Sequence, residues 1–154
     1  AQSAQAESHW DLFNRYSALQ SKSLIIERDL GQNKAVAVEA NKRSQILLRL
    51  REWQVSELQK TSRVPSLRRD NGLKQQAKSL EETPLFDADW YVRTYPDVAD
   101  LPRSPAEHFL QFGLFEGRRP SRDFDPVSYY ATHPDVLKQR TNAVLHAAAD
   151  MIKV

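Results

Sequence analysis

Histidine and aspartate are the residue types best suited to chemistry here, and both recur at a fixed spacing in the C-terminal half of the chain. His108 and His146 lie 38 residues apart. Either could bind a metal, but no His, Asp or Glu cluster with ligand spacing surrounds them. The aspartates that could act as general acids or bases stand at predicted helix starts or turns, where they cap the backbone; they are Asp87, Asp97, Asp125 and Asp135. We therefore predict packing or hydrogen-bonding histidines and no catalytic residue, metal or cofactor.

Aromatic and arginine side chains of the same region offer a second kind of chemistry, contact with a glycan or a protein partner. Aromatic rings can stack on sugar rings, and arginines can hold an acidic sugar or a phosphate. The candidate contact residues are Trp90, Tyr91, Tyr129, Tyr130, Arg118, Arg119 and Arg122. Core packing of the aromatics and a solvated charged turn are the preferred interpretations, so ligand contact is the alternative.

A sequence repeat positions these residues. Residues 86–98 return as residues 124–136, with Phe-Asp at the start, a tyrosine four positions after the Asp, and Pro-Asp-Val at the end. The same offset relates Ser104 to Asn142. A period near 40 residues indicates one supersecondary unit per repeat. We predict two short helices in each copy, packed against each other and against the next copy.

Capping residues predict the ends of the first helix in each copy. Asp87 and Asp125 are good N-caps, and each follows a phenylalanine that can pack on the tyrosine at the fourth helical position. Pro126 fits the first helical position of the second copy. Pro96 and Pro134 end these helices, because the residue before a proline resists the α conformation.

The second helix of the first copy has its own signals. Ser104 and Glu107 form a capping box, Gly113 is a suitable C-terminal stop, and Gly117 turns the return segment. The matching helix of the second copy begins near Asn142. That copy lacks counterparts of the two glycines, so it is either a divergent terminal repeat or an incomplete one.

The repeat resembles a short motif of bacterial proteins. The motif reads Phe-Asp-x-x-Tyr-Tyr, then Pro-Asp-Val, then Pro-x-x-His-Phe-Leu-x-x-Gly-x-x-Glu-Gly-Arg. It occurs beside glycosyltransferases of surface-polysaccharide synthesis, including rhamnan-synthesis-type enzymes, and in some secreted calcium-binding, hemolysin-like proteins. The second copy departs from it after His146. The first copy carries the match at Phe86, Asp87, Trp90, Tyr91, Pro96, Asp97, Val98, Pro105, His108, Phe109, Leu110, Gly113, Glu116, Gly117 and Arg118.

The resemblance implies an accessory module of a polysaccharide enzyme and brings no catalytic residues. The leading hypothesis is a non-catalytic oligomerisation and docking module of a bacterial cell-surface polysaccharide glycosyltransferase, with other polysaccharide-assembly proteins as partners. The alternatives are a carbohydrate-binding module and a segment of a secreted or surface structural protein. We expect this segment itself not to be an enzyme, although it could belong to a larger one. We expect a cytoplasmic location, either free or peripheral to the inner membrane.

Residues 1–61 carry a heptad pattern typical of a coiled coil. Alternating spacings of three and four residues place apolar or aromatic side chains at nine of fourteen positions from Leu12 to Leu58, without a slip in register. The helix should need a partner, because polar residues weaken the seam at five positions, Ser23, Asn33, Ser44, Arg51 and Gln54. We predict self-association through the seam residues Leu12, Tyr16, Leu19, Ile26, Leu30, Asn33, Leu47 and Leu58.

Two structures fit this pattern. The helix is either continuous or a hairpin that breaks at residues 31–33, and the preserved register favours the continuous form. Asn33 would fix the register of a continuous coiled coil or cap the second helix of a hairpin. The bulky residues Trp10, Phe13, Ile25, Ile46 and Trp53 fall outside the seam, so they either broaden the interface or contact the C-terminal domain.

Residues 62–85 read as a basic linker with a short helix. Pro65 and the Asn71-Gly72 pair punctuate the linker, and Arg63, Arg68 and Arg69 make it basic. Leu73 to Glu82 can form the helix, which Thr83-Pro84 ends.

Composition limits the remaining choices. The chain has 154 residues, a net charge of +2 and no cysteine. These values argue against a dedicated nucleic-acid binder and exclude disulfides. No apolar run is long enough to span a membrane. The start has neither an initiator Met nor a signal core, so we interpret the chain as a fragment of a longer one. We predict an all-α protein with a coiled coil at 1–61, a linker at 62–85 and two 38-residue helical hairpin repeats at 86–154.

Overall fold

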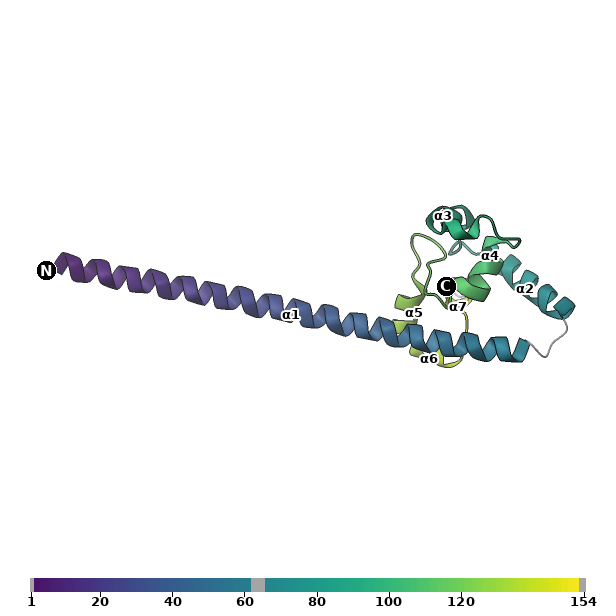
Figure 1. Cartoon of the computed structure of the whole chain (residues 1–154), viewed down its shortest axis with the longest axis horizontal. Helices are drawn as coiled ribbons and strands as arrows, with labels where there is room; N and C mark the ends of the chain where they lie inside the picture. The colour runs from purple at the N-terminus through teal and green to yellow at the C-terminus, as the bar shows by residue number, and fades with distance from the viewer. Residues whose placement is uncertain (1, 62–65, 153–154) are drawn as a thin grey trace. The chain divides into compact units, whose positions relative to one another are not determined.

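The computed structural model describes residues 2–61 and 66–152, and within them the side chains of residues 2–9, 12, 61 and 66–69 lie outside the description. Every regular element in this part of the chain is a helix, and the fold is a long N-terminal helix followed by short ones (Figure 1). The predicted fold class is confirmed. The elements are α1 (Gln2–Thr61), α2 (Ser66–Glu81), α3 (Ala88–Thr94), η1 (Pro96–Val98), α4 (Pro105–His108), η2 (Phe109–Gly113), α5 (Pro126–Thr132), α6 (Pro134–Lys138) and α7 (Ala143–Ile152).

The chain divides into two compact units, residues 1–41 and residues 42–154, and α1 contributes to both. Gly31 lies inside α1, so the continuous form of the helix is the one observed and the hairpin is not. A methyl group added at Gly31 would meet nothing within 4 Å, so packing does not require a glycine at this position. Asn33 is helical as well and does not cap a second helix.

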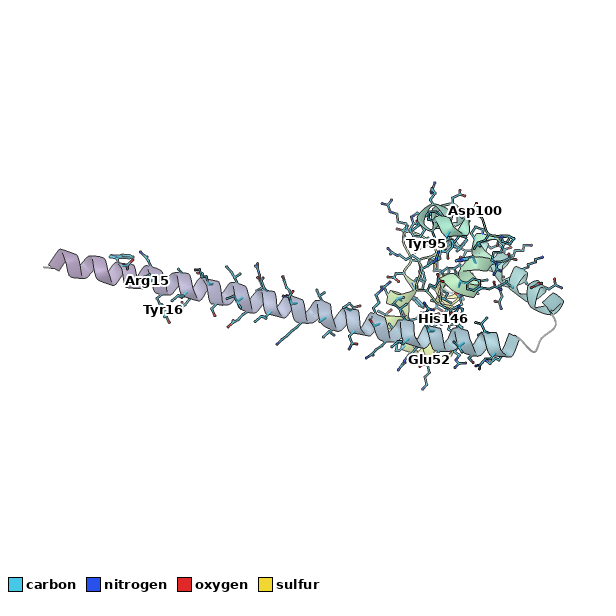
Figure 2. The ribbon with its side chains drawn as sticks, in the orientation of Figure 1. Arg15, Tyr16, Glu52, Tyr95, Asp100 and His146 are labelled. Atoms are coloured by element: carbon cyan, nitrogen blue, oxygen red, sulfur yellow. The ribbon has the colours of Figure 1, made fainter. Side chains whose placement is uncertain are left out.

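The first unit exposes its apolar side chains. Tyr16, Leu19, Ile26 and Leu30 are each more than half exposed, and Figure 2 shows Tyr16 projecting from α1. The seam position Leu12 has no described side chain. The off-seam residues Trp10, Phe13 and Ile25 are exposed too.

The second unit has a core that takes in the end of α1. Ile46, Leu50 and Trp53 are buried there, and Trp53 meets Phe115 edge-on at a ring-centroid distance of 5.2 Å. These three residues follow the three-and-four spacing one position ahead of the predicted seam. The expectation of an unslipped register is therefore wrong beyond Ser44, because the apolar face rotates toward the domain.

The last seam residues reflect that rotation. Leu47 is half-buried and packs against the domain core, so it is a core residue and not an oligomer contact of the predicted kind. Leu58 is exposed and lines a groove of the same unit. Arg43, at the start of the unit, donates to Asp125 at 3.0 Å and ties α1 to the cap of α5.

Helix α2 corrects the predicted linker. It begins at Ser66 and runs through Asn71-Gly72, so the described part of this segment is mostly helix. Ala77 and Leu80 are buried and Leu73 is half-buried, which confirms the predicted apolar side. Their burial outweighs the cost of a glycine in a helix, about 1 kcal/mol. The helix ends at Glu81, ahead of Thr83-Pro84 as predicted, whereas Pro65 and the side chains of Arg63, Arg68 and Arg69 lie outside the described residues.

The predicted caps are present. The Asp87 carboxylate accepts from the Trp90 amide at 2.9 Å, and the Asp125 carboxylate accepts from the Val127 amide at 3.0 Å. The capping box joins Ser104 and Glu107 in both directions. Both predicted staples form, since ring centroids lie 5.8 Å apart for Phe86 and Tyr91 and 5.5 Å apart for Phe124 and Tyr129.

Each copy contains a further short helix that was not predicted. The prolines end α3 and α5 as expected, but they also open η1 and α6, and the Pro-Asp-Val segment is helical in both copies. A proline is favoured at the first position of a helix, which explains how one residue ends one helix and starts the next. Each copy therefore has more helices than the predicted two: α3, η1 and the consecutive α4 and η2 in the first copy, and α5, α6 and α7 in the second.

Tertiary contacts leave no room for a side chain at either glycine of the first copy. Gly113 is the last residue of a π-helical turn, so the helix ends there as predicted, and a Cβ at this position would also clash with the Tyr91 hydroxyl. Gly117 has a φ of 72°, as the predicted turn requires. A Cβ at Gly117 would lie 2.6 Å from Leu47, so α1 also depends on this glycine.

Candidate functional site

The two repeated histidines make the same hydrogen bond. Tyr91 Oη lies 3.0 Å from His108 Nδ1, and Tyr129 Oη lies 2.8 Å from His146 Nδ1. Both partners are related by the 38-residue offset, so the repeat conserves a tyrosine–histidine pair between its first and last helices. His146, labelled in Figure 2, belongs to α7, and its Nδ1 also lies 3.4 Å from Asp150. The predicted hydrogen-bonding role of both histidines is confirmed.

Burial makes the first pair a fixed, uncharged contact. Tyr91 has no exposed surface and His108 is 5% exposed. Burial raises the pKa of Tyr91, and burial followed by the positive charge of Arg118 lowers the pKa of His108. A neutral imidazole beside a neutral phenol is suited to holding α3 against α4. It is poorly placed for proton exchange with a substrate.

Stability should therefore fall in mildly acidic solution because of His108. An unfolded histidine binds its proton below about pH 6.5, whereas the native imidazole resists it. The free energy of unfolding should decrease as the pH falls through that value and level off once native His108 is protonated, with a slope of up to about 1.4 kcal/mol per pH unit. Urea titrations between pH 7.5 and 5 measure it. The variant His108→Gln should give a flatter profile, and an equal slope in both proteins would contradict this assignment.

Arg118 is paired with carboxylates of its own domain, so its guanidinium is not a free anion site. Its guanidinium donates to both carboxylate oxygens of Asp97, at 3.0 and 2.8 Å, and to Glu116 at 2.6 Å. It also lies 4.8 Å from the ring centroid of Tyr95. The hydrogen bond to Arg118 lowers the pKa of Asp97. Asp97, predicted to turn the backbone, thus also links η1 to the return segment.

The other predicted contact residues differ in burial. Tyr91 and Tyr130 are 0% and 1% exposed, so neither can stack on a sugar, and core packing is the correct interpretation for both. Tyr129 is half-buried and stacks on His133 at 4.1 Å, and Trp90 is half-buried beside Tyr95. Arg119 and Arg122 are exposed. Trp90 and Arg118 both pack against the ring of Tyr95, and the backbone N–H of Arg119 donates to the Tyr95 hydroxyl, so these three predicted residues lie around one tyrosine.

A groove of about 750 Å³ lies between the end of α1, α2, η2 and α7. Two of its arginines are engaged: Arg103 covers the ring of Phe112 at 5.3 Å, and Arg140 donates to Ser56 at 2.9 Å. Gln54 donates to the backbone oxygen of Gln111 at 3.0 Å across it. Apolar wall residues include Leu58, Leu73, Leu110 and Leu145. Sequence reasoning missed this groove, because it depends on how α1 and α2 pack.

The exposed seam of α1 is the most extended candidate surface. It comprises the described side chains at seam positions in the first unit, namely Tyr16, Leu19, Ser23, Ile26, Leu30, Asn33, Ala37 and Ala40. Every one of these residues is exposed. A long helix with an uncovered apolar stripe is marginal in water and favours association.

Comparison with known proteins adds no relative. No protein-family model, no curated protein and no solved structure matches the chain. Within residues 2–61 and 66–152, no three His, Cys, Asp or Glu side chains gather where a metal could bind. None of the helices described combines the length and the apolar character that a membrane crossing requires.

Proposed function

We propose that this chain is a non-catalytic oligomerisation and docking module. Helix α1 pairs with other copies of itself through its exposed seam, and each copy carries one helical domain. One observation carries the proposal: the same helix buries Ile46, Leu50 and Trp53 against the domain core but leaves Leu19, Ile26 and Leu30 more than half exposed. The domain core covers the buried apolar residues of α1, whereas covering the exposed ones requires a second chain.

The use of polar groups in the domain supports a non-catalytic role. The carboxylates of Asp87 and Asp125 cap helices, and the Asp97 carboxylate is held by Arg118. His108 is bound to a buried tyrosine. Groups engaged in these contacts hold helices in place. A general acid or base, in contrast, must be able to reach a proton of the substrate.

The resemblance of the repeat extends the proposal to a setting. A module of this kind would serve a bacterial cell-surface polysaccharide glycosyltransferase, holding it as an oligomer beside other assembly proteins in the cytoplasm or at the inner membrane. The alternative of a carbohydrate-binding module loses support because Tyr91 and Tyr130 are buried.

Seam substitution tests the proposal. Ile26→Asp should raise the dissociation constant of the oligomer by at least about a hundredfold, because pairing would bury an ionised carboxylate. Light scattering over a dilution series measures the mass. Leu24→Asp is the matched control, since Leu24 is 67% exposed and lies outside the seam, and it should leave the mass unchanged. A native chain that stays monomeric at high concentration would remove the proposal.

A further inference from the structure

The heptad register places four charged residues of the first unit beside the seam. With Tyr16, Ser23, Leu30 and Ala37 at a positions, the g positions include Lys22 and Asp29, and the e positions include Glu27 and Lys34. All four charged residues are exposed. Side chains at e and g flank the a and d residues and meet those of the partner helix, so their signs select the orientation of the pair.

A parallel pair in register matches these signs. In that arrangement a g residue faces the e residue five positions later on the other helix. Lys22 then faces the partner's Glu27, and Asp29 faces the partner's Lys34. Both contacts join opposite charges, and each occurs twice because the pair is symmetric. Asn33 would face the partner's Asn33, so the amide in the seam gains an amide partner and not an apolar one.

The best antiparallel pairing matches the signs less well. It places Ser23 opposite the partner's Asn33, which also keeps polar residues together. The same offset brings Glu27 against the partner's Glu27 and Asp29 against the partner's Asp29. Two like-charge contacts near the centre of the pair disfavour this arrangement.

The domain fixes where pairing stops. From Ile46 onward the apolar face of α1 packs on its own domain core, and the half-buried Leu47 is part of that packing. Arg43, the g residue before this point, is already bonded to Asp125. Resting on the proposed function, we propose that α1 pairs with α1 of a second copy in parallel and in register, over residues 16–44 and no further.

Single cysteines can test the orientation directly, because the chain contains none. Ser23→Cys and Ala37→Cys place a thiol at two a positions. In a parallel pair in register, each thiol faces its own copy within disulfide reach. In an antiparallel pair, at most one position along the helix can face itself. Ser21→Cys is the matched control, since Ser21 is exposed on the side of α1 away from the seam.

The readout is the fraction of disulfide-linked dimer on a non-reducing gel after equilibration in a glutathione buffer. Ser23→Cys and Ala37→Cys should each give at least about tenfold more linked dimer than Ser21→Cys, because pairing raises the effective thiol concentration to the millimolar range. Efficient linkage only in a mixture of Ser23→Cys and Asn33→Cys chains would overturn the parallel arrangement. Light scattering on the reduced proteins separates the two claims: an oligomer without self-linkage overturns the orientation alone, and a monomer overturns the proposed function as well.

Discussion

Gly113→Ala should destabilise the helical domain by about 3 kcal/mol, a large effect for one methyl group. The added Cβ would stand 2.1 Å from the Tyr91 hydroxyl and 3.1 Å from the ring of Phe109. The tyrosine cannot swing aside, because it is fully buried and bonded to His108. Urea unfolding followed by near-ultraviolet circular dichroism measures the loss without interference from the helicity of α1.

Two further variants show that the cause is this contact. Gly72→Ala is the matched control: nothing lies within 4 Å of its Cβ position in α2, so the change should be neutral or stabilise by up to about 1 kcal/mol. Tyr91→Phe removes the atom that clashes. In a double-mutant cycle it should recover at least about 1 kcal/mol of the Gly113→Ala loss. Strictly additive losses would show that the close approach is not what Gly113 provides.

Leu50→Ala should cost about 2–5 kcal/mol, the range for deleting a large side chain from a packed core. Leu50 has no exposed surface and belongs to the cluster that joins α1 to the domain. The substitution would remove apolar contacts and weaken the packing of α1 on the domain. The denaturant concentration at the midpoint of the near-ultraviolet transition should therefore fall. Chemical denaturation at a fixed protein concentration measures the change in the free energy of unfolding.

Leu48→Ala provides the control two residues away. Leu48 is 65% exposed, so its truncation should change the free energy of unfolding by less than about 0.5 kcal/mol. A similar cost for both leucines would mean that the end of α1 is not docked on the domain as the structure has it.

Local chemistry explains what the sequence could predict. The caps at Asp87, Asp125 and Ser104 depend on residues within four positions of each other, so the sequence alone carries the signal. The tyrosine–histidine pairs were open to prediction through the repeat, because His108 and His146 share an offset with Tyr91 and Tyr129. The sequence does not show which atoms meet, so only a hydrogen-bonding role could be expected.

Tertiary contacts explain what could not be predicted. The reason for Gly113 is a tyrosine 22 positions earlier in the chain, which no local rule reaches. Helix α2 continues through Asn71-Gly72 because Ala77 and Leu80 gain burial that the turn signal ignores. The face of α1 that packs on the domain core could in principle be read from the sequence. Ile46, Leu50 and Trp53 are spaced four and three apart, but a search in one fixed register reads them as outliers.

With α1 paired as proposed, the behaviour of the domain would depend on the concentration of the protein. A helix without tertiary cover takes its stability from association, so mass action sets its order. Below the dissociation constant of the pair, folded domains would act singly. Above it, two domains would reach a partner surface together, and avidity would multiply a weak contact by about 10²–10⁴. Binding would then rise steeply with the copy number of the chain itself, with no effector required.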